Sequence, residues 1–180
     1  AHPACWPLDL APQTARQTRK LCQAFAVPEG PEIRRAADKV QAAIVGRPIR
    51  RIFFGLPGLS KYARAMERAR VEEVQTFGKA MVTHFDHGLS VYSHNQLYGK
   101  WYTVRPDQDP ATNRQLRFAV RTDHRDALLY SASTIEVLRR EDVRDHPFIS
   151  RLGPDPLHDD VDVTTFSKRL RDPGFSGRQV

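Results

Sequence analysis

The first regular pattern in the chain is a set of apolar residues at helical spacing between positions 33 and 44. One helical face would carry the side chains of Ile33, Ala36, Ala37, Val40 and Ile44. Gly30 followed by Pro31 marks the start, because proline is accommodated at the first helical position. Gly46 and Pro48 mark the end. The pattern therefore predicts an amphipathic helix that begins near Gly30.

After this helix the pattern changes to short runs of apolar, β-branched and aromatic residues, which is typical of strands. Predicted strands cover residues 51–54, 71–75, 80–85, 89–93, 116–120 and 127–131. Turn residues at 86–88 and 123–126 join neighbouring strands as hairpins. A second helix is predicted at about 165–171, before Pro173 and Gly174. The predicted fold class is therefore mostly β with flanking helices, an antiparallel β-sandwich built as a meander with a helix at each end.

Length, composition and charge limit the possible functions. The chain has 180 residues, of which 40% are hydrophobic, so one domain with a sizeable core is expected. No stretch is long and apolar enough to span a membrane. Lysine and arginine exceed aspartate and glutamate by 28 to 21, and leaving out residues 1–27 (three basic, one acidic) gives 25 to 20. This excess permits nucleic-acid binding without demonstrating it.

Both cysteines, Cys5 and Cys22, lie within residues 1–27. Residues 28–180 therefore contain neither a disulfide framework nor a Cys-x-x-Cys zinc motif, and a cytoplasmic location is predicted. No compact metal geometry is expected from the histidines in predicted strands and turns, which are His84, His87 and His94. We predict no metal and no cofactor in this chain.

Residues 28–36 read Pro-Glu-Gly-Pro-Glu-Ile-Arg-Arg-Ala and could place a reactive amine at a chain terminus. A terminal proline carries a secondary amine that, when neutral, can attack a sugar aldehyde carbon and form an iminium. In the chain as written, Val27 acylates Pro28, and an amide nitrogen is not a nucleophile. The chain is therefore expected to be inactive unless Pro28 becomes the amino terminus. We interpret residues 1–27 as upstream sequence translated by mistake, with proteolytic exposure of Pro28 as the alternative.

Four charged residues each have an ordinary interpretation beside a functional one. The helix dipole stabilises carboxylates at a helix start, so Glu29 and Glu32 alone would be first-turn acids. Lys79, between two predicted strands, is either a solvated hairpin charge or an ammonium aimed at a DNA phosphate. Arg151 would by itself be a surface arginine.

The run Gln96-Leu97-Tyr98 is ambiguous on periodicity, because Leu97 and Tyr98 could be strand core. Enzymes that act on a base extrude it from the duplex, and apolar and amide side chains commonly fill the gap. In that interpretation Leu97 and Tyr98 form a wedge, and Gln96 hydrogen-bonds the orphaned base.

Several separated motifs together resemble one protein family. They occupy residues 28–36, 76–80, 92–99, 128–133, 146–148 and 151–155. In this order and at these spacings, the chain resembles the formamidopyrimidine-DNA glycosylase family over nearly all of residues 28–180. Gly30 and the Gln96-Leu97-Tyr98 run are similar to the endonuclease VIII branch rather than to the 8-oxoguanine branch. The resemblance implies the antiparallel sandwich of that family's N-terminal domain.

The resemblance implies base excision repair by a DNA glycosylase and AP lyase that removes oxidised pyrimidines through a Schiff base on Pro28, with β,δ-elimination at the abasic site. Glu29 would donate a proton during opening of the sugar ring, and Glu32 would orient groups or balance charge. Lys79 would bind DNA and donate protons during elimination, while Arg151 would contact a phosphate. The implied partner of this monomer is double-stranded DNA with oxidised pyrimidines or abasic sites.

Family members continue into a helix-two-turn-helix region and a four-cysteine zinc finger, whereas this sequence ends at Val180. We therefore expect a doubtful leader at 1–27, a catalytic domain at 28–175 and a truncated start of the helical region at 176–180, without the zinc. The chain as written should be weak or inactive. The alternatives are a non-catalytic DNA-binding remnant, the 8-oxoguanine branch of the family, or a small-molecule enzyme that uses proline as a general base.

Overall fold

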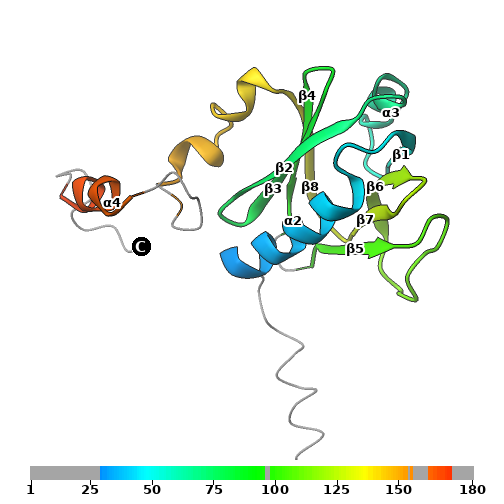
Figure 1. The fold of residues 1–180 in the computed structure, drawn as a ribbon, viewed down its shortest axis with the longest axis horizontal. Helices are drawn as coiled ribbons and strands as arrows, with labels where there is room; N and C mark the ends of the chain where they lie inside the picture. The colour runs from blue at the N-terminus through cyan, green and yellow to red at the C-terminus, as the bar shows by residue number, and fades with distance from the viewer. Residues whose placement is uncertain (1–28, 96–97, 154, 156–161, 172–180) are drawn as a thin grey trace, which may run out of the picture.

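In a computed structural model, two antiparallel sheets face each other, and helix α2 packs against strands of both (Figure 1). The structure describes residues 29–95, 98–153, 155 and 162–171. One sheet contains, in spatial order, β1 (Ile49–Phe54), β6 (Leu116–Thr122), β7 (Asp126–Tyr130) and β5 (Lys100–Val104). The other contains β2 (Val71–Phe77), β3 (Ala80–Phe85), β4 (Leu89–His94) and β8 (Thr134–Arg139). The helices are α2 (Gly30–Ile44), α3 (Ser60–Met66), α4 (Val163–Leu170) and the 3-10 helices η1 (Glu141–Val143) and η2 (Ile149–Arg151).

The predicted fold class is confirmed, because the described residues form an antiparallel sandwich with few helices. All predicted strands and both predicted helices are present within two residues of their expected bounds. The predicted meander is only partly right. β2, β3 and β4 follow one another, but β1 pairs with β6 and β8 returns to β4. Pairing between strands so far apart cannot be recognised from a local sequence pattern. It depends on how each sheet buries its apolar face.

Besides the short 3-10 helices η1 and η2, three elements were not predicted from the sequence, namely α3, β5 and β8. They are seven, five and six residues long, so each gives few repeats of any period. β5 and β8 are the outer strands beside β7 and β4, respectively. Each sheet therefore has one more strand than the sequence pattern indicated.

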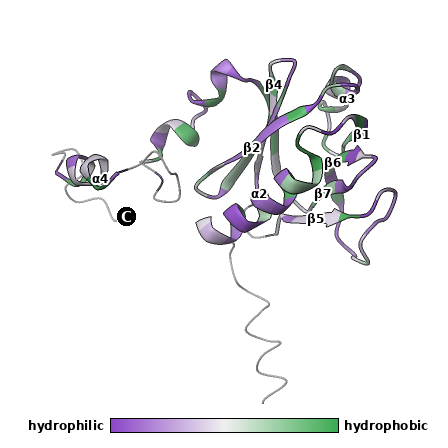
Figure 2. Ribbon diagram, viewed as in Figure 1, coloured by the Kyte–Doolittle hydropathy of each residue, from purple (hydrophilic) through white to green (hydrophobic). Residues whose placement is uncertain are grey.

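Helix α2 forms because its apolar residues share one face. Figure 2 shows its ribbon changing from purple over its charged residues to green at its C-terminal end, where Ala43 and Ile44 enter the core. Val40 and Ile44 are fully buried. This face packs against β2 of one sheet and β5 of the other, which fixes the position of the helix start.

The main core lies between the two sheets and beneath α2 and α3. A second apolar cluster covers the outer face of the β2-β3-β4-β8 sheet, where Val143 and Ile149 from the η1–η2 segment pack on Phe77 and Tyr92. Both faces of β3 are thereby covered, which explains why every residue of this strand is buried. Within the described part of the chain, no helix is long and apolar enough to cross a membrane.

Candidate active site

The start of α2 holds two of the predicted site residues, Glu29 and Glu32. Glu29 is the N-cap residue, with extended backbone at φ −95° and ψ 175°, and Pro31 follows in the first turn. The backbone N–H of Glu29 donates to Oε2 of Glu32 at 3.1 Å, as in a capping box. The Glu29 side chain completes the box by accepting from the backbone N–H of Glu32, so both carboxylates are engaged at the helix start. Pro28 lies outside the described residues.

A tight turn between β2 and β3 brings Lys79 to Glu29. Gly78 has a φ of 56°, in the left-handed region that favours glycine. The Lys79 Nζ atom lies 3.0 Å from Oε1 and 2.9 Å from Oε2 of Glu29. The two side chains are 41% and 60% exposed, so the pair remains open to solvent and to a ligand. Lys79 is therefore paired with a residue of the α2 start while its ammonium stays accessible to solvent.

His94 lies at the same site, although the sequence analysis considered it only as a metal ligand and expected no compact metal geometry. The register of β3 and β4 pairs it with Ala80, the residue after Lys79. Burial lowers the pKa of His94, and the positive charge of Lys79 lowers it further. Its ring packs edge-on against Phe148, with centroids 4.9 Å apart, and its buried Nε2 atom has no hydrogen-bond partner among the described residues. A neutral imidazole therefore lies beside the Lys79 ammonium.

Arg151 belongs to a segment that contacts the turn before Lys79. Arg151 ends η2 and is exposed, and the next residue is Leu152. A Cβ atom built on Gly78 would lie 3.6 Å from the Leu152 side chain, so the two segments are in contact. The Arg151 guanidinium makes no hydrogen bond or ion pair with another described residue. It is available to an anion that approaches the Lys79 turn.

Tyr98 lies in a loop that closes tightly after β4. The N–H of Gly99 donates to the carbonyl of Asn95 at 2.7 Å, and a Cβ atom on Gly99 would lie 2.6 Å from Asn95 backbone atoms. Only glycine fits there. Tyr98 is 68% exposed, which rules out the strand-core alternative for this residue. Gln96 and Leu97 lie outside the described residues.

The described residues contain no group of three or more histidine, cysteine, aspartate or glutamate side chains that could hold a metal ion. His84 instead hydrogen-bonds with Ser90 Oγ at 2.8 Å and with Gln75 Oε1 at 3.2 Å. His87 packs edge-on against Phe85, with ring centroids 5.8 Å apart. The arrangement at the start of α2 thus offers a carboxylate, an ammonium and a neutral imidazole, which suit proton transfer and anion binding.

Solved DNA glycosylases share this fold. Lactococcus lactis Fpg in complex with DNA containing N7-benzyl-Fapy-dG aligns with a TM-score of 0.65 at 19% identity, over 81% of this chain and 56% of that chain. The formamidopyrimidine-DNA glycosylase of the same organism, non-covalently bound to DNA with an AP site, aligns with a TM-score of 0.64 at 18% identity, over 80% and 57%. At such identities the likeness shows the fold alone, which is that of these formamidopyrimidine-DNA glycosylases.

Sequence comparison identifies the family. The model described as the formamidopyrimidine-DNA glycosylase N-terminal domain matches residues 27–145, and the chain belongs to this family. Endonuclease 8 of Shigella flexneri is 47% identical over 153 residues, which are 85% of this chain and 58% of the relative. Endonuclease 8 of Escherichia coli strain 55989 is 46% identical over the same shares. The chain spans 58% of the length of these curated relatives.

Proposed function

We propose that this chain carries the catalytic part of a base excision repair enzyme, a DNA glycosylase and AP lyase that removes oxidised pyrimidines. The observation that carries the proposal is the ion pair between Lys79 and Glu29, two predicted site residues that are 50 positions apart in the chain. Family membership and the similarity to endonuclease 8 support it. The partner is double-stranded DNA with oxidised pyrimidines or abasic sites, bound by a monomer in the bacterial cytoplasm.

The chemistry requires Pro28 as the amino terminus of a catalytic domain that covers residues 28–175. Its secondary amine attacks C1′ of the damaged nucleotide, the bond from C1′ to the base breaks, and the base leaves with a proton. Glu29, the next residue, donates a proton to the ring oxygen as the sugar opens. The resulting iminium joins the Pro28 nitrogen to C1′. Removal of sugar protons then expels the two flanking phosphates in β,δ-elimination.

Lys79 and Arg151 hold the phosphates beside the reacting sugar. An ammonium has three donor hydrogens, and that of Lys79 is half-exposed, so a DNA phosphate can take it over from Glu29. Glu29 is then released toward the sugar, while Glu32 stays bonded to the helix start. Leu97 and Tyr98 enter the space left by the extruded nucleotide, and Gln96 hydrogen-bonds the orphaned base.

The choice between branches of the family rests on the relatives. Those that are 46–47% identical are named endonuclease 8, which favours removal of oxidised pyrimidines over the 8-oxoguanine branch. The competing proposal, a non-catalytic DNA-binding remnant, is favoured by the peptide bond between Val27 and Pro28. Both proposals predict DNA binding. They differ in whether a free Pro28 amine forms a covalent bond to DNA.

Borohydride trapping on abasic-site DNA tests the proposal directly. A protein that starts at Pro28 should give a covalent adduct, because borohydride reduces the iminium, and the chain that starts at Ala1 should give none. Equal trapping by both proteins, without cleavage of the longer one, would refute the assignment of the terminal amine. Absence of trapping by either protein would favour the non-catalytic remnant.

The role of Glu29 is tested on two substrates. In the protein that starts at Pro28, Glu29→Gln should strongly slow excision of an oxidised pyrimidine and spare trapping on a preformed abasic site, where base loss has already happened. Asp38→Asn is the matched control, because it removes an exposed α2 carboxylate that is bonded to Arg34 at 3.0 Å instead of to Lys79. Equal losses on both substrates in the Glu29 variant would argue against proton donation.

A further inference from the structure

A groove of about 180 Å³ lies between α2 and β5 and begins at the candidate active site. Glu32 lines one part of it, one turn from Glu29. Its apolar wall is formed by Ala36 and Val40 of the helix and Trp101 of the strand. Arg35 and Lys39 also line the groove, and both are exposed. The groove therefore combines an apolar wall with a cationic rim.

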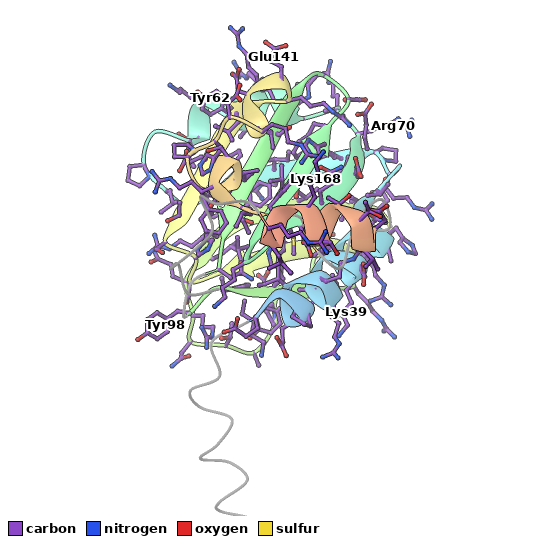
Figure 3. The ribbon with its side chains drawn as sticks, turned by 90° about the vertical axis from the view of Figure 1, so that its left-hand side faces the viewer. Lys39, Tyr62, Arg70, Tyr98, Glu141 and Lys168 are labelled. Carbon is purple, nitrogen blue, oxygen red and sulfur yellow. The ribbon has the colours of Figure 1, made fainter. Side chains whose placement is uncertain are left out.

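The two cations of the rim are free to bind a ligand. Neither Arg35 nor Lys39 makes a hydrogen bond or ion pair with another described residue. Arg34, on another side of the same helix, is bonded to Asp38 at 3.0 Å. Residues four apart on a helix have Cβ atoms about 5–6 Å apart, so Arg35 and Lys39 can both reach one anion. Figure 3 shows Tyr98 at the lower left and Lys39 at the lower right of the molecule.

An anion that fits this groove has an apolar portion next to its charge. A deoxynucleotide unit meets this requirement, because its phosphate can lie on the cations while its sugar lies against the indole of Trp101. The Glu32 carboxylate repels a phosphate from the end of the groove nearest the active site. The phosphate position is therefore set at Arg35 and Lys39.

Helix geometry gives the distance from the reacting nucleotide. Arg35 and Lys39 are six and ten positions after Glu29, which corresponds to about 9 and 15 Å along α2 at 1.5 Å per residue. A DNA strand advances about 3.4 Å per nucleotide along the duplex axis. A strand that runs along α2 would reach the groove roughly three to four nucleotides from the reacting position.

We propose that this groove binds one flanking deoxynucleotide of the DNA strand, with its phosphate on Arg35 and Lys39 and its sugar against Trp101. The inference rests on the proposed function, because it assigns an additional DNA contact to the same enzyme. It extends the bound length of the strand beyond the wedge at Tyr98. Arg35 and Lys39 are binding residues with no part in the chemistry at C1′.

The first test measures DNA binding by the 180-residue chain. The probe is a fluorescent duplex with a tetrahydrofuran abasic-site analogue, titrated at salt concentrations between about 50 and 200 mM. The double variant Arg35→Gln/Lys39→Gln should lower the salt slope of log K by about one unit, as expected for one lost phosphate. Glutamine is a good helix former, so α2 should persist. The single variant Lys39→Gln should give a smaller decrease in the same direction.

The control is Arg34→Gln/Arg47→Gln, which also removes two positive charges, one from the half-buried Arg34 that is paired with Asp38 on α2 and one from the exposed Arg47 after its C-terminal end. Its salt slope should stay within about half a unit of the wild-type slope. An equal decrease in both double variants would mean that only net charge matters, and would overturn the inference while leaving the proposed function intact. A wild-type chain that binds no duplex would overturn the proposed function together with it.

The second test locates the contact along the DNA. The duplex is shortened on one side of the abasic analogue, and then on the other, to fewer than about three base pairs. On one of the two shortened duplexes, wild type and Arg35→Gln/Lys39→Gln should bind with equal affinity, because the flanking phosphate is gone. A difference that persists on both shortened duplexes would place the contact elsewhere and overturn the inference.

Discussion

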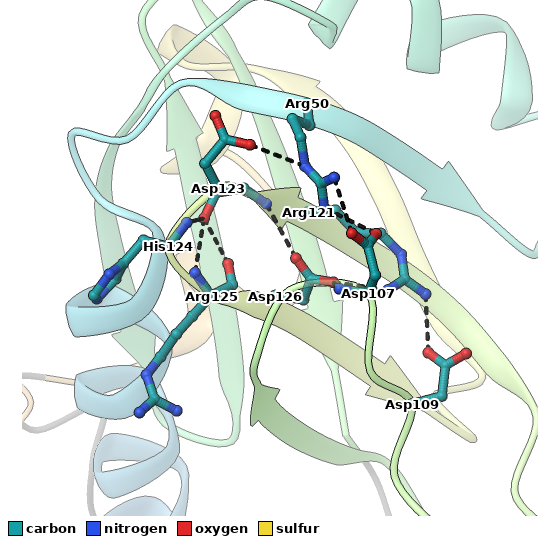
Figure 4. Close-up of polar contacts among 9 residues, drawn as sticks. Arg50, Asp107, Asp109, Arg121, Asp123, His124, Arg125 and Asp126 are labelled. Carbon is teal, nitrogen blue, oxygen red and sulfur yellow. Dashed lines mark hydrogen bonds and ion pairs between the residues drawn. The ribbon is translucent and has the colours of Figure 1, made fainter.

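Two charged regions of this molecule are built in opposite ways. At the β6–β7 hairpin, the carboxylate of Asp126 is fully buried and accepts three hydrogen bonds (Figure 4). The donors are Arg121 Nη1 at 2.7 Å and the backbone N–H groups of Asp107 at 3.0 Å and Thr122 at 3.2 Å. Every approach to this carboxylate is occupied by the protein itself.

The pair at the start of α2 is open instead. Lys79 and Glu29 contact each other, and both side chains keep about half of their surface in solvent. Buried charges are retained only when they are fully bonded, whereas an exposed pair contributes little to stability and can exchange its partners. The hairpin network therefore contributes to the stability of the fold. The Lys79–Glu29 pair contributes little stability and remains accessible to a ligand.

The largest expected effect is on stability, at Asp126. Asp126→Ala should lower the free energy of unfolding by about 3–5 kcal/mol, because Arg121 and two backbone N–H groups lose a buried acceptor. Urea unfolding followed by intrinsic fluorescence measures the change. The variant should still bind DNA with wild-type affinity at temperatures where it is folded.

Asp109→Ala is the control for this experiment. Asp109 also bonds Arg121, at 2.9 Å, but its side chain is 63% exposed. Its loss should cost less than about 1 kcal/mol. If the two variants were equally destabilised, burial would not be what distinguishes the two regions.

Only one of these regions could be predicted from the sequence. Glu29, Glu32 and Lys79 lie in motifs whose residue types and order indicate chemistry. The β6–β7 hairpin was predicted, but the network also includes Asp107 from the loop after β5 and Arg50 of β1. These residues reach the hairpin only because β5 pairs with β7 and β1 pairs with β6. That adjacency follows from non-local pairing, which no local pattern encodes.

His94 shows where sequence reasoning could have gone further. The hairpin at 80–85 and 89–93 was predicted with its turn at 86–88, and that turn already fixes the strand register. Continuing the pairing of His84 with Ser90 to the strand ends places His94 opposite Ala80. The position of His94 beside Lys79 could therefore have been predicted from the sequence. The position of Trp101 could not, because strand β5 was not predicted.

The next effect in size concerns Tyr98, which we propose to act as a wedge in the duplex. Tyr98→Ala should weaken binding to a duplex with an abasic-site analogue by about 1–3 kcal/mol, the usual contribution of an aromatic ring stacked on a base. Binding to the same strand without its complement should change less, because there is no duplex gap to fill. Tyr98→Phe keeps the ring and should behave like wild type on both probes. Equal losses on duplex and single strand in the alanine variant would argue against a wedge.

Lys79 should affect binding without affecting stability. Lys79→Ala should lower the salt slope of log K for DNA by about one unit, since one phosphate contact is lost. Its free energy of unfolding should change by less than about 1 kcal/mol, because the pair with Glu29 is exposed. Lys61→Ala, at an exposed lysine of α3, is the control and should leave the slope unchanged. An unchanged slope in the Lys79 variant would return this residue to the role of a surface charge.

The smallest expected effect is a pH dependence of stability that His94 contributes. Burial and the charge of Lys79 lower the folded-state pKa of His94 below its ordinary value of 6.5. Between the lowered pKa and 6.5, the unfolded chain therefore binds a proton that the folded chain does not, so stability falls as the pH falls through this window.

Urea unfolding at several pH values between about 7.5 and 5 should show a shallower fall for His94→Gln than for wild type. A slope remains in that variant because burial also lowers the pKa of His84. His124→Gln, at the exposed β6–β7 turn, controls for removal of a histidine from the surface. If His94→Gln kept the full wild-type slope, the imidazole would already be free to protonate in the folded protein. Water would then reach His94 on β4 as well as Lys79. The two charged regions would differ even more in their accessibility to solvent.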